Sequence, residues 1–165
     1  MRRSGVAIIA CLMLIHPAAA QQATKFKGFF IGMSKKDAIS LMPQGYRLKQ
    51  GPAAIGFVPP NAMMDLASAM FDLDPDGTVT QIYLNKSIFG AEEMPGDQFM
   101  KAIVSNYGVG EVSCETKHTE YERLNGVPKY ITSTECTGYS KNGELVQLTE
   151  SRIKVTKPRQ KPSFN

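Results

Sequence analysis

The fold is decided by the stretch VSCETKHTEYERLNGVPKYITSTECT, residues 112–137. It holds two runs rich in Thr, Val, Ile and Tyr, which are residue types that favour strands. Asn125 and Gly126 stand between the runs, and both tolerate the positive φ angles of a tight hairpin turn. The stretch therefore predicts two antiparallel strands, over residues 112–121 and 129–137.

The register of this hairpin brings two cysteines together. If residues 124–126 form the loop, Arg123 faces Val127, and Cys114 then faces Cys136. We predict a disulfide between them, with Cα atoms about 4.4–6.8 Å apart and a stabilisation of about 3 kcal/mol. Two reduced thiols in the core are the alternative. A metal site is disfavoured, because neither Cys belongs to a Cys-x-x-Cys pair.

The flanking segments complete a second half of the chain. Residues 97–107 carry apolar side chains at helical spacing and predict a helix, with Gly108 as its left-handed cap. After the hairpin turn signal of Asn142 and Gly143, residues 145–155 predict a third strand. Residues 156–165 are basic and contain two prolines, so we expect a disordered tail.

The first half starts with a short helix and continues with strands. Ser34 can cap a helix over residues 34–42, and Asp37 three positions later completes a pattern similar to a capping box. Residues 46–58 predict short extended pieces, whereas residues 61–70 remain ambiguous between helix and irregular structure. Residues 69–73 and 78–84 flank a Pro- and Gly-containing turn and predict a hairpin.

Helix followed by strands, twice, predicts an α+β fold with an antiparallel sheet and two short helices on one face. We expect a single domain over residues 29–155, preceded by a flexible segment at 21–28. Its halves, 29–86 and 89–155, are consistent with a tandem of two helix-then-strands units.

Residues 1–20 have the order of a removable secretory signal peptide. Two arginines precede a short apolar core over residues 6–15. Ala18 and Ala20 supply small residues at positions −3 and −1, so cleavage is expected before Gln21. We therefore predict a periplasmic or secreted protein with no transmembrane segment once the signal is removed.

Cys11 offers a second interpretation of the export signal. Residues 8–11 loosely match a lipoprotein cleavage box, in which Cys11 would be lipidated. The residues that follow are still hydrophobic, whereas the mature start of a lipoprotein is usually polar. The interpretation as a signal peptide without lipidation is favoured.

Charge argues against nucleic acid as a partner. Without the two signal arginines, the chain keeps 17 Lys and Arg against 15 Asp and Glu, a net charge of +2. A nucleic-acid-binding domain would carry a larger and more clustered basic excess.

The sharpest motif is Asp72, Asp74 and Asp76 followed by Gly77. A calcium-binding loop begins with acidic residues at alternate positions followed by Gly, since carboxylates supply the hard oxygen ligands that calcium prefers. The twelfth position should hold Glu, but Tyr83 stands there. A hairpin turn with solvated acids is the favoured interpretation, and calcium is the alternative.

No motif predicts catalysis or a cofactor. His118 is the one His beyond the signal, and it falls in a predicted strand. No Gly-x-Ser-x-Gly elbow and no phosphate-binding Gly loop accompany it. A lone His in a strand is most often a surface residue, so we predict that the protein is not an enzyme.

Residues 31–38, Ile-Gly-Met-Ser-Lys-Lys-Asp-Ala, resemble the Gly-Met-Ser/Thr opening of small outer-membrane-assembly lipoproteins of the SmpA/OmlA type. They are also similar to the opening of the related β-lactamase-inhibitor-protein-like fold. The resemblance covers mainly residues 31–43. It implies a capped short helix before antiparallel strands, and action by protein–protein contact. Cys11 is misplaced for a family lipoprotein, and the chain is longer than one family unit.

These observations favour an exported, non-catalytic protein that binds another envelope protein. The expected surface is the exposed sheet face or the loops at 51–60 and 89–96. Calcium or small-ligand binding is the second hypothesis, and an enzyme of unrecognised type is the third.

Overall fold

The computed structural model describes residues 23–62, 65–122 and 128–157, and the side chains at 119–131 are not described. The predicted signal peptide, with Ala18, Ala20 and Gln21, lies outside the described residues, as does most of the predicted tail. Thr156, placed in the tail by the sequence, is the last residue of a strand. The tail prediction therefore starts too early by one residue.

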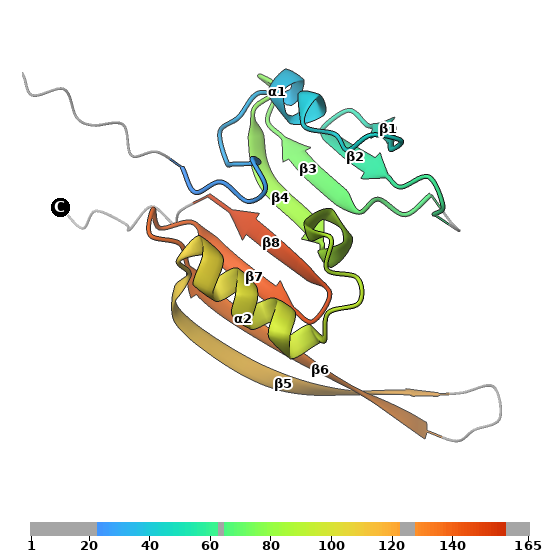
Figure 1. Ribbon diagram of the computed structural model, residues 1–165, viewed down its shortest axis with the longest axis vertical. Coiled ribbons are helices and arrows are strands. Elements are labelled where there is room, and N and C mark those ends of the chain that lie inside the picture. The colour runs from blue at the N-terminus through green and yellow to red at the C-terminus, as the bar shows by residue number, and fades with distance from the viewer. Residues whose placement is uncertain (1–22, 63–64, 123–127, 158–165) are drawn as a thin grey trace, which may run out of the picture.

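The described residues form one antiparallel sheet of eight strands, and the prediction of an α+β fold is confirmed (Figure 1). The strand order is β1-β2-β3-β4-β8-β7-β6-β5. The bounds are β1 Arg47–Gln50, β2 Ala54–Val58, β3 Ala69–Leu73, β4 Val79–Asn85, β5 Gly110–Glu122, β6 Pro128–Tyr139, β7 Leu145–Thr149 and β8 Arg152–Thr156. The helices are α1 Lys35–Ser40, a 3-10 helix η1 Lys86–Phe89, and α2 Gly96–Tyr107.

The element order repeats. In each half a helix precedes a meander of four strands, α1 before β1–β4 and α2 before β5–β8. The halves join through their last strands, since β4 pairs antiparallel with β8 from Gln81 opposite Thr156 to Asn85 opposite Arg152. This arrangement matches the predicted order of helix then strands in both halves.

One face of the sheet carries the core. Apolar side chains follow one another in register across the strands, because directly paired residues share a face. The longest such row runs through Leu48, Phe57, Ala69, Leu84, Ile153, Leu148, Cys136 and Cys114. Ala38 of α1 and Phe99 and Ile103 of α2 join the same core, so both helices contribute to this face.

The start of α1 follows the predicted capping. The Ser34 hydroxyl accepts a hydrogen bond from the backbone N–H of Asp37 at 3.1 Å. It also donates to the Asp37 carboxylate at 2.7 Å. The two side chains therefore bond each other, whereas in a capping box the second side chain would accept from the backbone N–H of the first residue. α2 ends at Gly108, which adopts the left-handed conformation as predicted.

Two expectations differ from the structure, and one ambiguous segment is settled in part. The strand predicted over 145–155 is a hairpin, because β7 and β8 pair around Glu150 and Ser151. In the segment that the sequence leaves ambiguous, the described residues 65–68 form no helix. The segment predicted to be flexible at 21–28 is packed from Thr24 onward, where Phe26 is fully buried and stacks on Tyr107 with ring centroids 4.8 Å apart.

The hairpin register of β5 and β6 is confirmed, with Cys114 directly opposite Cys136 and the sulfur atoms joined as a disulfide. Their Cα atoms are 4.0 Å apart. The predicted separation of about 4.4–6.8 Å is therefore wrong. Directly opposed residues of a narrow antiparallel pair already lie at the short end of that window, at about 4.5 Å, and the bridged cysteines lie closer still.

Candidate binding face

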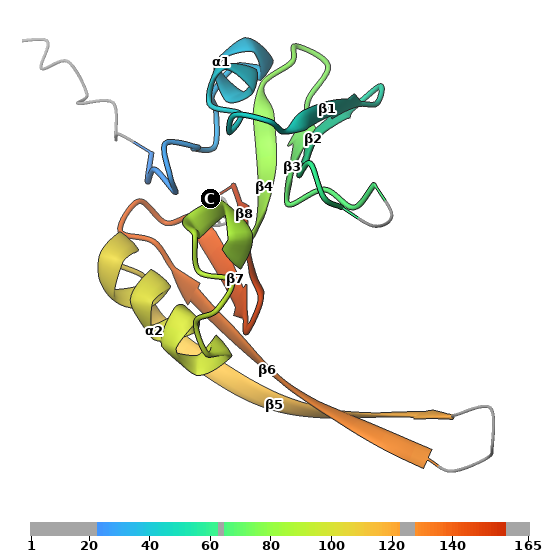
Figure 2. The same cartoon turned by 45° about the vertical axis from the view of Figure 1, so that its right-hand side comes forward.

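The second face of the sheet is left uncovered by the helices. In Figure 2 the two ends of the sheet, β1–β3 and the β5–β6 hairpin, bend toward the same side, away from α2. Most directly paired residues on this uncovered face are polar or partly exposed, with Gly56 and Val58 of β2 as buried exceptions. Its central row runs through Lys49, Gly56, Met70, Tyr83, Lys154 and Gln147.

Tyr83 is held at the centre of this uncovered face. Its hydroxyl accepts a hydrogen bond from the Gln81 side-chain amide, which also donates to the Asp72 carboxylate. The Lys154 Nζ lies 5.3 Å from the centroid of the Tyr83 ring, within the range of a cation–π contact. Contacts within the chain therefore hold the aromatic ring in place.

Beyond Tyr83, charged groups continue toward the β5–β6 hairpin. The Lys117 Nζ lies 2.8 Å from a Glu135 carboxylate oxygen, and the Gln147 amide donates to the other oxygen at 3.3 Å. The hydrogen bond from Lys117, and then its charge, lower the pKa of Glu135. A hollow of about 230 Å³ opens among Tyr83, Glu135 and Gln147.

An apolar groove of about 380 Å³ lies at the other end of the uncovered face, over β2 and β3. Leu66 and Met70 line it and are strongly exposed, at 65% and 43%. Gly56 forms its floor, where a Cβ atom would lie 3.1 Å from the Cβ of Ala67. The missing side chain lets the segment at 65–67 lie close against the sheet.

Arg47 fixes that segment. Its guanidinium lies 2.6 Å from the Asp65 carboxylate, and Asp65 has a positive φ of 51°. The hydrogen bond and the charge of Arg47 lower the pKa of Asp65. A lowered carboxyl pKa means that the pair is intact at neutral pH and is lost only as the pH falls through the folded-state pKa, below the usual aspartate range.

The predicted calcium ligands do not converge. Asp72 accepts from Gln81, whereas one Asp74 oxygen accepts from the backbone N–H groups of Asp76 and Thr78, at 3.1 and 2.8 Å. Among the residues the structure describes, no three His, Cys, Asp or Glu side chains gather as a metal site. The predicted hairpin turn between β3 and β4 is confirmed, and the Asp74 carboxylate bonds the backbone of that turn.

We expect Asp74→Ala to lower the free energy of unfolding by about 1 kcal/mol, because it removes the acceptor of two turn N–H groups. Asp76→Ala is the matched control, since it removes the same charge and should change stability by less than about 0.5 kcal/mol. Urea titration measures both. A rise of the thermal midpoint with millimolar calcium that disappears in both variants would instead support the calcium hypothesis.

His118 lies exposed on β5, and its Nδ1 is 3.0 Å from the Thr132 hydroxyl. No Ser and acid join it in a catalytic arrangement within the described side chains. In the part of the chain that the structure describes, no helix has the length and apolar character needed to span a bilayer.

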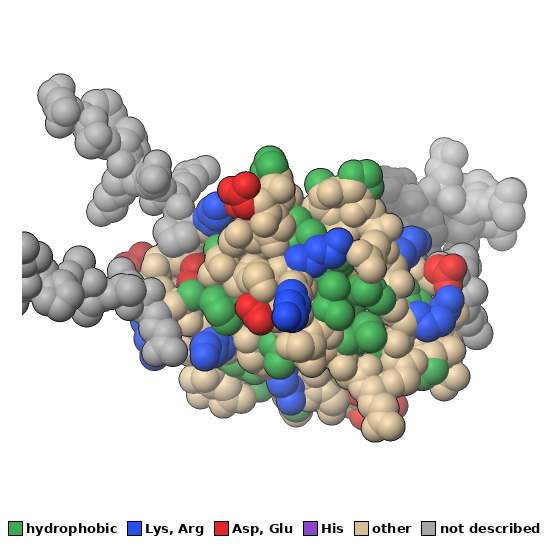
Figure 3. Space-filling view, turned by 90° about the horizontal axis from the view of Figure 1, so that it is seen from above, with side chains coloured by type: hydrophobic (Ala, Val, Ile, Leu, Met, Phe, Trp, Pro, Cys, Tyr) green, Lys and Arg blue, Asp and Glu red, His purple; other side chains and the backbone are tan. Residues whose placement is uncertain are grey.

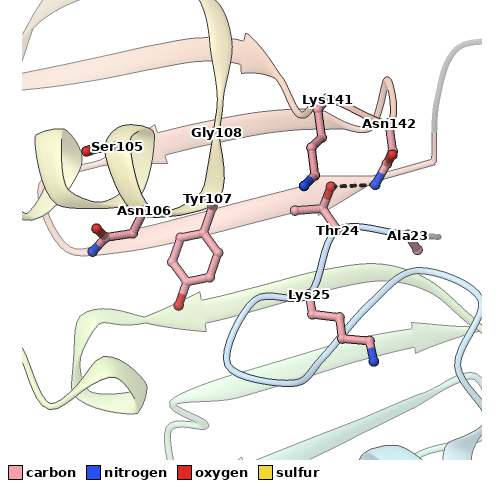
Figure 4. A pocket seen from close by; sticks show the side chains of 9 residues that line it. All are labelled: Ala23, Thr24, Lys25, Ser105, Asn106, Tyr107, Gly108, Lys141 and Asn142. Atoms are coloured by element: carbon pink, nitrogen blue, oxygen red, sulfur yellow. Dashed lines mark hydrogen bonds between the residues drawn. The ribbon is translucent and has the colours of Figure 1, made fainter. Parts of the chain in front are cut away.

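A polar pocket of about 720 Å³ lies between the N-terminal segment, the end of α2 and the β6–β7 turn. Its two cationic side chains, Lys25 and Lys141, reach in different directions (Figure 4). Thr24 closes one side through a hydrogen bond from Asn142 at 2.9 Å. The groups do not converge on a common point, so the pocket is a weaker candidate than the uncovered face.

Hydrogen bonds to a buried carboxylate explain why the N-terminal segment is packed against the rest of the protein. Glu144 is buried, and its carboxylate accepts from the Thr24 backbone N–H at 3.0 Å and from the Ser140 hydroxyl. A hydrogen-bonded carboxylate tolerates burial far better than an unpaired one. Sequence reasoning missed this contact, because Glu144 and Thr24 are 120 residues apart.

The α1 end of the molecule presents a mixed surface. Figure 3 shows apolar side chains there interspersed with Lys and Arg. A shallow hollow beside Ile39 is bordered by Lys35 and Lys36, and the exposed Leu41 ends the helix. This surface lacks the continuous apolar lining of the groove at Leu66 and Met70.

The described residues define a small α+β protein with one antiparallel sheet, one face of which the helices leave uncovered. Searches against protein-family models, curated proteins and solved structures find no match to the chain.

Proposed function

We propose that this is an exported, non-catalytic protein that binds another protein of the cell envelope through the uncovered face of its sheet. The observation that carries the proposal is the apolar groove of Leu66 and Met70 within a face that the helices leave free. Exposed apolar side chains gathered in one hollow of an otherwise polar face are typical of an interaction site.

The face has the composition of an interface. An apolar groove lies beside a fixed aromatic ring, Tyr83, and charged groups surround both. Interfaces combine a desolvated apolar centre with a polar rim, and immobilised aromatic residues are frequent anchors. Little conformational entropy would be lost at Tyr83 on binding, because its hydroxyl and ring are already held.

Charge indicates the kind of partner. Arg47 and Lys117 are paired with acids of the same chain, while Lys49, Arg152 and Lys154 form no described ion pair. These three cations border the groove or the neighbouring hollow. The complementary partner therefore presents an apolar side chain flanked by acidic residues.

Export rests on separate support. The signal-like start, the disulfide and the resemblance of residues 31–43 to outer-membrane-assembly proteins all favour the periplasm. Calcium binding and catalysis receive less support, because their candidate residues, Asp72, Asp74, Asp76 and His118, are exposed or engaged in the local turn and strand contacts.

Site-specific photo-crosslinking in cells tests the proposal. A crosslinking residue at Met70 should form an adduct with an envelope protein, whereas the same residue at Leu41, similarly exposed but just after α1, should not. Lys154→Glu should reduce the adduct at position 70, because it reverses a charge that faces the partner. The absence of any adduct at 70, or equal adducts at both positions, would contradict the proposal.

A further inference from the structure

The strand β5 is an edge strand of 13 residues, and it is free along its outer side in the described structure. Edge strands of this length expose unpaired backbone groups that can pair with another strand. A bulge between Gly110 and Ser113, with Glu111 at a positive φ of 52°, interrupts regular pairing at its start. The regular part of the edge therefore begins at Ser113.

The pairing of β5 with β6 determines which backbone N–H and C=O groups of β5 point outward. The Cα atoms of Cys114 and Cys136 are 4.0 Å apart, which marks a narrow, non-hydrogen-bonded pair. Residues of narrow pairs point their N–H and C=O groups away from the neighbouring strand. Cys114, Thr116 and His118 therefore offer backbone donors and acceptors to the free side of β5.

One charged side chain of this edge, Glu115, lacks an ion-pair partner among the described side chains. Glu115 lies directly opposite Glu135, and like charges in that position destabilise a ladder. The Lys117 ammonium pairs with Glu135, while Glu115 forms no ion pair with any side chain that the structure describes. A cation placed beside Glu115 from outside the chain would complete the charge balance.

We propose that two copies of this protein pair through their β5 strands, antiparallel about a two-fold axis at Thr116, to form one continuous sheet. In this register Glu115 of each copy faces Lys117 of the other, and Cys114 faces His118. Centring on Glu115 or on Lys117 would instead place like charges opposite each other. About six backbone hydrogen bonds would close the edge.

The dimer is independent of the proposed partner-binding function, because it uses the strand edge rather than the groove at Leu66 and Met70. Sedimentation analysis of the chain from Gln21, from micromolar to near-millimolar concentration at low salt, should show a monomer–dimer equilibrium. Raising the salt should weaken it, since the interface contains two exposed ion pairs.

Charge reversal tests the register. Glu115→Lys should raise the dimer dissociation constant about tenfold or more, because both attractive contacts become repulsive. It should leave the monomer as stable or more stable, since it removes the Glu115–Glu135 conflict. Lys117→Glu should also weaken the dimer, and the double variant with both reversals should restore it.

The outcomes are decisive either way. A wild-type chain that stays monomeric at the highest concentration overturns the proposal. Unchanged dimerisation in Glu115→Lys, or a double variant no better than the singles, overturns the β5 register. Loss in each single variant with recovery in the double variant supports it.

Discussion

Replacing Phe71 by Ala should lower the free energy of unfolding by about 3–5 kcal/mol, the usual cost of emptying a buried aromatic site. Phe71 is fully buried on β3, between Ile55 and Ile82 in the neighbouring strands. Its ring centroid lies 4.8 Å from that of Phe29 and 5.2 Å from that of Phe57. The substitution removes contacts on several sides, and the rigid sheet limits collapse of the cavity.

Met70→Ala is the matched control, because it shortens the adjacent side chain on the uncovered face of the same strand. We expect a change within about 0.5 kcal/mol for this exposed position. Urea unfolding of both variants measures the difference. Equal losses in the two variants would contradict the division of β3 into a core side and an uncovered side.

The parts of the fold that the sequence predicts are those with strong local chemistry. The turn predicted at Asn125 and Gly126 lies outside the described residues, but the register that it implies places Cys114 opposite Cys136, and the structure has that register. Ser34 caps α1 and Gly108 ends α2 for the same reason, since hydrogen bonding and backbone freedom at these positions act within a few residues.

The missed elements depend on tertiary contacts. The β7–β8 turn consists of Glu150 and Ser151, with no Gly, Asn or Pro to mark it. Gly96 at the start of α2 leaves room for the Glu150 side chain, so packing fixes the turn rather than local preference. The N-terminal segment likewise looks polar in sequence, but Glu144 holds Thr24 from a distant strand end.

The candidate site was predictable in kind and not in detail. An antiparallel sheet with helices on one face leaves the other face open, so an exposed sheet face could be expected. The groove itself needs Gly56 beneath Ala67 and the ion pair of Arg47 with Asp65, which join residues far apart in the chain. The acidic motif at 72–76 left calcium as an alternative to the favoured hairpin turn, because one short turn uses the same residue types as the start of a calcium loop, and the structure has the turn.

Reducing the disulfide should have the second large effect, lowering the free energy of unfolding by about 3 kcal/mol for a closed loop of this length. The bridge spans a sequence separation of 22 residues. For a chain of about 150 residues, each kcal/mol shifts the thermal midpoint by roughly 2–4 °C, so a fall of roughly 6–12 °C is expected.

The position of the bridge says where the loss should appear first. β6 pairs with β7 only from Glu135 to Tyr139, so the hairpin beyond Cys114 and Cys136 is two strands wide in the described structure (Figure 2). Two-stranded ribbons are marginal in water without further support. The disulfide therefore joins the two strands at the base of this hairpin, where the pairing of β6 with β7 ends.

Amide hydrogen exchange on the oxidised and reduced protein locates the effect. Protection in β5 and β6 beyond the bridge should fall on reduction, whereas α1, at the opposite end of the sheet, should keep its exchange rates until global unfolding. Thiol titration of the unreduced, unfolded chain from Gln21 is the direct control. Two free thiols per chain would contradict the disulfide, and they would remove one support for an exported protein, because such bridges persist in oxidising compartments.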